Sequence, residues 1–512
     1  MTVSDNFDEN VKWFESAFED CGDIVSRIFP VGHFKQARIF VIYIDNMADS
    51  AFISLNVMEN FMMGIREVSP EMPIIEKDIY EALRDGGLTV ADISESETLE
   101  EAALSIMSGD MAVFIEFGEK ALIVSSKGFL SRGVTTAETE VVVQGSKEAF
   151  SEVIRTNTCL IRRRIRDINL KVKQLKIGRR SQTDIALVYL KGIVREDILA
   201  EVLRRLKGID IDALPDSGYI EQLIADDWKS PFPQGQMTER PDTAAAAILE
   251  GRIAIIVDNS PFALLVPVTL NTFFQSAEDY YQHFAIMSFM RIMRFIAGAV
   301  AMCLPALYIA LTSYHPSMIP MFLTFKMAGS RQGVPLPAFG EIIIMDLAFE
   351  LLREAGIRLP NAMGGAIGIV GGLIVGQAAV EAGFVSPVVV IVIAITGIAG
   401  FTITHNSLVG AFRLLKYLLI ILSAMLGLFG FWLGLLAVLI HLVSLRSFGI
   451  PYMFPFTSGE ANGGTDIKDS LLRFPIFSMK KRPIFASPGD LRRMNNNPTT
   501  AKDGADSNNM PL

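Results

Sequence analysis

FIAGAVAMCLPALYIALTSY, residues 295–314, and YLLIILSAMLGLFGFWLGLLAVLIHLVSL, residues 417–445, decide the fold of this chain. At about 1.5 Å rise per residue, each run is long enough to cross a hydrocarbon core of roughly 30 Å. Residues 367–403 form another apolar run, in which Glu381 is the only charged side chain. Before Arg294 the sequence is mixed and charged, as in a soluble protein. The sequence therefore predicts a soluble domain followed by an all-α polytopic membrane domain.

The composition agrees with this division. Half of the 512 residues are hydrophobic, which is more than one soluble core needs. The net charge of −10 argues against general nucleic-acid binding, because neutralising phosphates needs an excess of Lys and Arg. Cys21, Cys159 and Cys303 are far apart, which favours a reducing compartment and disfavours a zinc site or a disulfide framework. The N-terminus lacks the pattern of a cleaved signal peptide, so we expect the first domain in the cytoplasm.

We interpret the second half as six crossings, at about 295–314, 339–357, 363–384, 387–407, 412–428 and 430–446. With residue 294 inside, most basic flanks fall at cytoplasmic ends, as the positive-inside rule requires: Arg291, Arg294, Arg353, Arg358, Arg413, Lys416 and Arg446. The second crossing carries enough charge to be interfacial instead. The last two crossings are broken by glycines, so a re-entrant hairpin or one long tilted helix is the alternative.

The soluble half contains an apparent internal duplication. Residues 37–61 read as a strand, a turn and an amphipathic helix, and residues 183–206 repeat that order. Residues 97–124 read as a helix followed by a hairpin, and 241–266 repeat this too. The sequence thus predicts a two-lobed α/β cytoplasmic domain. The expected domains are a first lobe 1–150, a basic helical linker 151–180, a second lobe 181–290, a transmembrane domain 291–447 and a cytoplasmic tail 448–512, disordered toward its end.

The expected linker is strongly basic. Ten Lys and Arg residues lie between Arg155 and Arg180, against one acid, Asp167. A nucleic-acid site is disfavoured because aromatic stacking partners are missing. A solvated linker that packs on an acidic surface of a partner or lies near anionic lipid headgroups is favoured.

The third crossing has two distinct faces. Glycines fall every four residues on one face, which permits close approach of helix backbones: Gly364, Gly368, Gly372 and Gly376. The other face is apolar and ends in a polar pair: Ile367, Val370, Ile374, Gln377 and Glu381. Either the helix only packs against neighbours, or it lines a pore with an apolar constriction and a ring of carboxylates that selects cations.

The second crossing places three acids on one face, because Asp346, Glu350 and Glu354 follow at intervals of four residues. Like charges at this spacing repel, so the face must meet water, cations or basic partners, of which Arg353 is the nearest. A water-facing vestibule, an interfacial helix and a proton relay are the alternatives. Motifs of hydrolases, P-loop enzymes and zinc proteases are missing, so neither an enzyme nor a cofactor is predicted.

Several segments together carry a family resemblance: residues 140–190, FFQSAEDYYQHF (273–284), GVPLPAFGEIIIMDLAFELLREAGIRLP (333–360), IVGGLIVGQAAVEAGFVSP (369–387) and residues 445–475. In order along the chain, they resemble the A-subunit family of bacterial spore germinant receptors. The resemblance implies a protein of the inner spore membrane that works with a transporter-like B subunit and a lipoprotein C subunit. It also implies an oligomer, as a pentamer, that forms a nutrient-gated ion channel.

One segment departs from the family pattern, because residues 403–408 read Ile-Thr-His-Asn-Ser-Leu where Ile-Pro-x-x-Glu-Leu is expected. A paralogue that acts outside a nutrient receptor shares most of the same motifs. A secondary transporter and a non-conducting membrane scaffold are the alternative functions.

Overall fold

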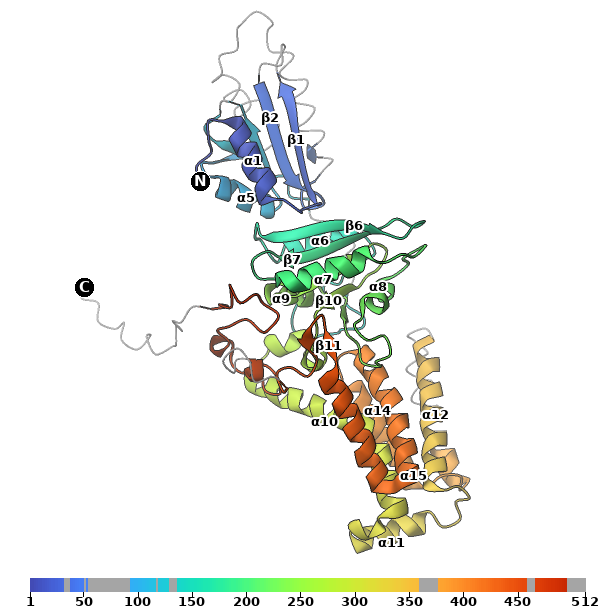
Figure 1. Cartoon of the computed structure of the whole chain (residues 1–512). Helices are drawn as coiled ribbons and strands as arrows, with labels where there is room; N and C mark the ends of the chain where they lie inside the picture. Colours follow the sequence, from blue (N-terminus) through green and yellow to red (C-terminus); the bar gives the residue numbers. More distant parts are fainter. Residues whose placement is uncertain are drawn as a thin grey trace, which may run out of the picture. The chain divides into compact units, whose positions relative to one another are not determined.

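The structure is a computed structural model that describes residues 1–31, 37–49, 52–53, 93–116, 118–128, 136–358, 376–457 and 466–494. The chain divides into two compact units. The first unit comprises Met1–Ala225, Gly235–Pro267 and Lys480–Leu512, and the second comprises Asp226–Gln234 and Val268–Met479. The first is built on β-sheets and the second on helices, so the predicted α/β and helical halves are both present (Figure 1).

Two five-stranded antiparallel sheets form the first unit. The first has the order β1-β2-β4-β5-β3, built from Ile24–Val31, Ala37–Ile44, Met111–Ile115, Ala121–Val124 and Ile93–Ser96. The second has the order β6-β7-β9-β10-β8, built from Leu170–Ile177, Thr183–Leu190, Ile253–Val257, Ala263–Val266 and Gln236–Thr238. Both sheets follow the same path along the chain, which is the duplication that the sequence predicts.

The helices repeat in the same way. Each lobe has a helix before its first strand, α1 (Phe7–Ala17) and α6 (Ile154–Arg162). Each also has a helix between its short edge strand and the last hairpin, α5 (Leu99–Met107) and α9 (Pro241–Leu249). Between β7 and β8 the second lobe has α7 (Glu196–Lys207) and α8 (Ser217–Ile224), and most of the corresponding segment of the first lobe, including most of the expected helix up to residue 61, lies outside the described residues. Strands β4 and β9 are buried along their whole length, as central strands covered on both faces must be.

The basic stretch 151–180 contains α6 and the strand β6, which is part of the second sheet. Its strand β6 pairs with β7 from Leu170 opposite Leu190 to Ile177 opposite Thr183. Its basic side chains contact the first lobe: Arg162 pairs with Asp23, and Lys173 lies 2.9 Å from Asp20. Part of the basic stretch is therefore paired with acidic side chains of the first lobe.

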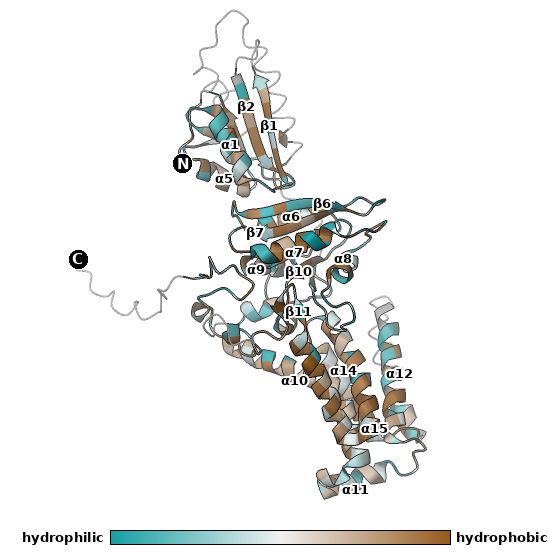
Figure 2. Ribbon diagram, viewed as in Figure 1, coloured by the Kyte–Doolittle hydropathy of each residue, from teal (hydrophilic) through white to brown (hydrophobic). Residues whose placement is uncertain are grey.

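Helices make up most of the second unit. They are α10 (Phe284–Ile309), which continues as the π-helical turn Ala310–Tyr314, α11 (Met321–Ser330), α12 (Ala338–Arg358), α14 (Pro387–Phe401) and α15 (Asn406–Ser444). Two of them, Phe284–Tyr314 and Asn406–Ser444, are long and apolar enough to cross a membrane. Helix α14 is apolar but spans only about 22 Å. Figure 2 shows hydrophobic residues along α14 and α15 and more hydrophilic ones on α12. Six crossings therefore remain a proposal.

Helix α15 is a hairpin of two helices. Gly427, in its middle, has φ +60° and ψ −138°, which is not a helical conformation. A Cβ on Gly434 would lie 2.8 Å from side-chain atoms of Leu419, whereas residues 15 apart in a straight helix are separated by about 22 Å. The chain thus folds back at Gly427. One long tilted helix is therefore wrong, whereas two crossings and a re-entrant hairpin both contain such a turn.

Candidate functional site: a charged cluster between α12 and α15

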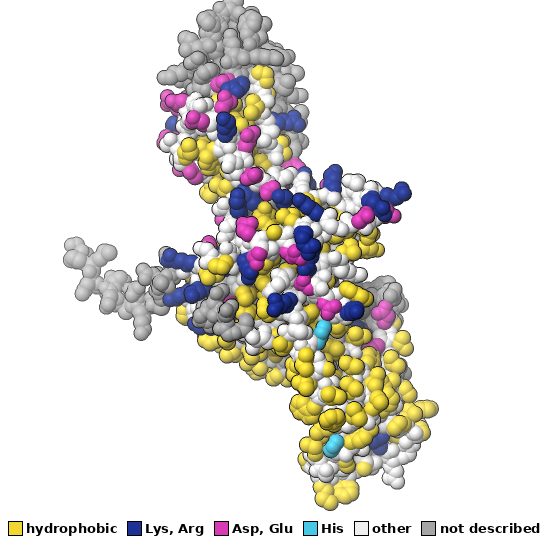
Figure 3. Space-filling model, in the orientation of Figure 1, with side chains coloured by type: hydrophobic (Ala, Val, Ile, Leu, Met, Phe, Trp, Pro, Cys, Tyr) yellow, Lys and Arg dark blue, Asp and Glu magenta, His cyan; other side chains and the backbone are white. Residues whose placement is uncertain are grey.

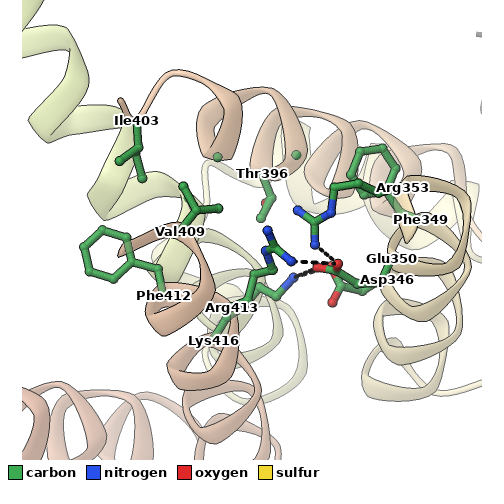
Figure 4. Close-up of a pocket in the computed structure, with 13 residues that line it drawn as sticks. Asp346, Phe349, Glu350, Arg353, Thr396, Ile403, Val409, Phe412, Arg413 and Lys416 are labelled. Atoms are coloured by element: carbon green, nitrogen blue, oxygen red, sulfur yellow. Dashed lines mark hydrogen bonds and ion pairs between the residues drawn. The ribbon is translucent and has the colours of Figure 1, made fainter. Parts of the chain in front are cut away.

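The acidic face of α12 meets basic side chains of α15 (Figure 4). Lys416 Nζ lies 2.6 Å from Asp346 Oδ1 and 3.6 Å from Glu350 Oε1. Arg413, one turn before Lys416, lies 3.8 Å from Glu350 Oε2. Arg353 pairs with Glu350 from the same helix. We call these five residues the charged cluster.

The charged cluster is largely withdrawn from water. Asp346 is 1 % exposed and Lys416 is 3 % exposed. Helix α14 closes the pocket around the cluster with Thr396, Gly397 and Gly400. Gly397 is necessary here, because a Cβ at this position would lie 2.6 Å from the ring of Phe349.

Burial makes the pairing in the charged cluster energetically important. Removing a charge from water costs several kcal/mol, and an opposite charge recovers this only with good geometry. Among the described atoms, Asp346 Oδ2 and Arg413 Nε are buried and have no hydrogen-bond partner. The cluster can therefore tie α12 to α15, and the helices would separate more readily if one charge were neutralised.

A second buried carboxylate lies near the start of α12. Glu341 is fully buried, and its Oε1 lies 3.1 Å from Arg331 Nε. Its Oε2 accepts a 2.8 Å hydrogen bond from the backbone N–H of Ser386, the residue before α14. An acid here is favourable, because a helix N-terminus has unpaired N–H groups and a positive partial charge. Glu341 thus joins α12, α14 and the segment after α11.

Most of the residues singled out in the third crossing lie outside the described part of the chain. These are the pore candidates Ile367, Val370 and Ile374 and the helix-packing candidates Gly364, Gly368 and Gly372. A described helical segment begins at Gly376, which is buried, with Val390 3.4 Å from the position of a Cβ. Gln377 and Glu381 are exposed, and Gln377 Nε2 donates a 2.9 Å hydrogen bond to Glu381 Oε1. Their role in a pore stays a prediction.

The acidic face of the second crossing has the basic neighbours that its charge requires. Asp346 and Glu350 point toward the basic side chains of the charged cluster, whereas Glu354 is exposed. The sequence predicts Arg353 as a partner of this face, but it marks Arg413 and Lys416 only as cytoplasmic flanks. Their spacing of three residues, which puts both on one face of an apolar helix, is the signal that was available.

Within the described residues, no group of His, Cys, Asp and Glu is arranged to hold a metal ion.

Comparisons with known proteins identify the family. Residues 12–485 match the family model described as Bacillus/Clostridium GerA spore germination protein. The chain is 38 % identical to the uncharacterized membrane protein YfkQ of Bacillus subtilis strain 168 over 95 % of this chain and 93 % of that protein. It is also 38 % identical to spore germination protein KA of the same strain, over 96 % of this chain and 88 % of that protein.

Spore germination protein GerLA of Bacillus cereus is 40 % identical over 81 % of this chain and 84 % of that protein. Among solved structures, the N-terminal domain of the A subunit of the Bacillus megaterium spore germinant receptor GerK3 is 31 % identical, covers 52 % of this chain and 96 % of that chain, and has a TM-score of 0.41. Because the family model covers most of its length, this chain belongs to the GerA spore germination protein family.

Proposed function

We propose that this chain is a membrane protein that acts in spore germination as the A subunit of a germinant receptor. The observation that carries the proposal is the family match over residues 12–485. Relatives that align with most of this chain are named spore germination proteins, and one is named a membrane protein. Two helices long and apolar enough to cross a bilayer support the membrane location.

In the finer proposal, several copies, as a pentamer, form a nutrient-gated ion channel in the inner membrane of the spore. A transporter-like B subunit and a lipoprotein C subunit are the proposed partners, and nucleic acid is not one. The termini are proposed to be cytoplasmic. Within the first unit, residues 480–494 pack on the second lobe: Ser487 N donates to Ile193 O, and Arg482 Nε donates to Leu249 O. A chain that leaves a folded unit at Pro267 and re-enters it at Lys480 crosses a bilayer an even number of times, and the proposed six crossings meet this condition.

The proposed pore lies on the third crossing. Ile367, Val370 and Ile374 form the dry constriction, and a ring of Glu381 attracts cations. The test uses spores that carry variant receptors. Val370→Ala should wet the constriction and cause cation leak or germination without nutrient. Glu381→Gln should lower cation release while the receptor still assembles, because the amide keeps the polar contact and removes the charge.

Gly372→Leu serves as the assembly control, since a large side chain on the glycine face should hold the helices apart. If Val370→Ala and Glu381→Gln both leave cation release and germination unchanged in an assembled receptor, the third crossing does not line the pore.

The charged cluster favours α12 as the second candidate for the conducting or gating helix. Its acids Asp346 and Glu350 are held by Lys416 and Arg413, so releasing these pairs would expose carboxylates to a pathway. The alternatives separate by flux measurements on the reconstituted receptor. A channel passes many ions per opening, a secondary transporter shows saturable coupled exchange, and a scaffold shows neither.

A further inference from the structure

Two segments of the second unit place large apolar side chains on the surface. The first is the start of α10, where the exposed residues are Phe284, Ile286, Phe289, Met290, Ile292, Met293 and Ile296. The second follows the membrane helices, where they are Ile467, Leu471, Leu472, Phe474, Ile476 and Phe477. Phe289 is 59 % exposed and Phe477 is 57 % exposed. We call residues 284–296 and 466–478 together the collar.

Buried polar contacts join the two segments into one surface. Arg291 on α10 is fully buried, and its guanidinium lies 3.0 Å from Asp279 Oδ2 and 2.8 Å from Asp469 Oδ1. Ser288 Oγ donates to Arg473 O at 2.8 Å and accepts from Arg473 N at 3.1 Å. These bonds hold the segment 466–478 along α10, although about 180 residues separate the two in the sequence.

The charged side chains of the collar are mostly turned inward. The collar contains two acidic and four basic residues, Asp466, Asp469, Arg291, Arg294, Lys468 and Arg473, and two more acids, Glu278 and Asp279, lie just before it. Arg294 pairs with Asp279 at 2.8 Å, and Arg473 is 4 % exposed. Figure 3 shows hydrophobic side chains along the surface of α10 and over the membrane helices of the same unit. A joined apolar surface of this kind marks an interaction site.

The length of the first apolar helix indicates what covers this surface. Phe284–Tyr314 has 31 residues, whereas about 20 suffice to cross a hydrocarbon core. About ten residues at its start, up to Arg294, are therefore surplus to a crossing. The collar is continuous in sequence with a helix proposed to lie in lipid, so a lipid surface is the occupant that the chain itself brings to it.

We propose that the collar inserts into the boundary between headgroups and acyl chains of the bilayer. The guanidinium groups of Arg291 and Arg294 pair with Asp279, and that of Arg473 donates to the carbonyl of Gln282. Insertion of the collar therefore depends on its apolar area and not on attraction to anionic lipid. Added salt should then have little effect on the insertion of the collar, because salt screens mainly exposed charges. The inference rests on the membrane location in the proposed function and not on ion conduction.

The test measures depth in the full-length protein in lipid nanodiscs, where water reaches both faces. Phe289→Cys and Phe477→Cys are labelled with an environment-sensitive fluorophore after Cys21, Cys159 and Cys303 are replaced by Ala. Leu104→Cys is the control, because Leu104 is 58 % exposed on a helix of the first unit. Fluorescence at residues 289 and 477 should be quenched by lipids that carry a quencher near the headgroup and protected from aqueous iodide. Leu104→Cys should show the reverse.

The quenching at residues 289 and 477 should be the same in neutral nanodiscs and in nanodiscs with anionic lipid, at low and at high salt. Quenching by iodide at either position would overturn the proposal. Protection from both quenchers, with cross-linking between chains from Phe289→Cys or Phe477→Cys, would assign the surface to a second copy and would also overturn it. Cation flux plays no part in this measurement, so its outcome is independent of channel activity.

Discussion

Lys416 is a buried residue of α15 whose Nζ lies 2.6 Å from Asp346 Oδ1 on α12. Breaking a buried pair by removing one partner costs about 3–5 kcal/mol, since the other charge stays buried alone. Lys416→Met and Asp346→Asn should each lower the melting temperature of the full-length protein in detergent. The double variant should be more stable than either single variant, because no unpaired charge remains. Lys326→Met, at an exposed position, is the control. Additive losses in the double variant would contradict the pairing.

Glu140 gives a pH-dependent prediction at the same scale. Burial raises the pKa of its carboxyl to about 7, although a 2.6 Å hydrogen bond from Thr238 Oγ1 opposes this. In the unfolded chain the Glu140 carboxyl ionises near its ordinary pKa. The free energy of local unfolding around Glu140 is therefore highest below that ordinary pKa. It falls as the pH rises toward 7 and stays low above it.

Glu140→Gln keeps an acceptor for Thr238 without the charge, so it should slow hydrogen exchange around residues 136–150 at pH 8 and have little effect near pH 4. The comparison of variant with wild type at each pH cancels the intrinsic exchange rate. A stabilisation that is equal at both pH values would show that the ionisation of Glu140 is not the cause.

At the scale of elements, Gly427 decides that α15 is a hairpin. Its φ of +60° with ψ −138° is accessible almost only to glycine, and a Cβ would lie 2.7 Å from the ring of Tyr314. Gly427→Ala should therefore cost about 1–3 kcal/mol from backbone strain, plus the displacement of Tyr314. Gly410→Ala is the matched control, because a Cβ there meets nothing within 4 Å.

The measurement is the melting temperature of the two variants in detergent, together with proximity of the hairpin arms from a cross-link between Leu419→Cys and Gly434→Cys. Equal stability of the Gly427 and Gly410 variants, with the cross-link kept in both, would contradict a glycine-dependent turn.

The elements of the first unit were largely predictable, and those of the second unit were less so. The repeat of strands and helices was visible because alternation and amphipathic periods are local signals. For β6 the sequence leaves a basic strand or a loop open and predicts a solvated linker, whereas Lys171 reaches Ala17 O of the first lobe at 2.6 Å. Helix α11 was missed because it buries none of its residues, so no core periodicity marks it. Likewise Lys416 was read as a flank, since one sequence does not show which helices become neighbours.

At the scale of the whole molecule, the proposed topology places the first unit and the tail on one side of the membrane. Leu104→Cys and Asp490→Cys are exposed positions in the first unit, before and after the membrane helices. Both should react with an impermeant thiol reagent from the same, cytoplasmic side, because Ala486 bridges to Val194 in the folded unit. Lys326→Cys, between α10 and α12, should react from the opposite side. Labelling of residues 104 and 490 from opposite sides would require an odd number of crossings.

The proposal of an ion channel depends most directly on whether the chain forms a ring, because a central pore needs several copies around an axis. The decisive measurement is the mass of the full-length protein released from lipid nanodiscs, by native mass spectrometry. The account predicts a closed homo-oligomer, with a pentamer as the expected state, and loss of that oligomer in Gly372→Leu. A monomer that persists in lipid, with partner subunits present, would contradict a pore built from the third crossing.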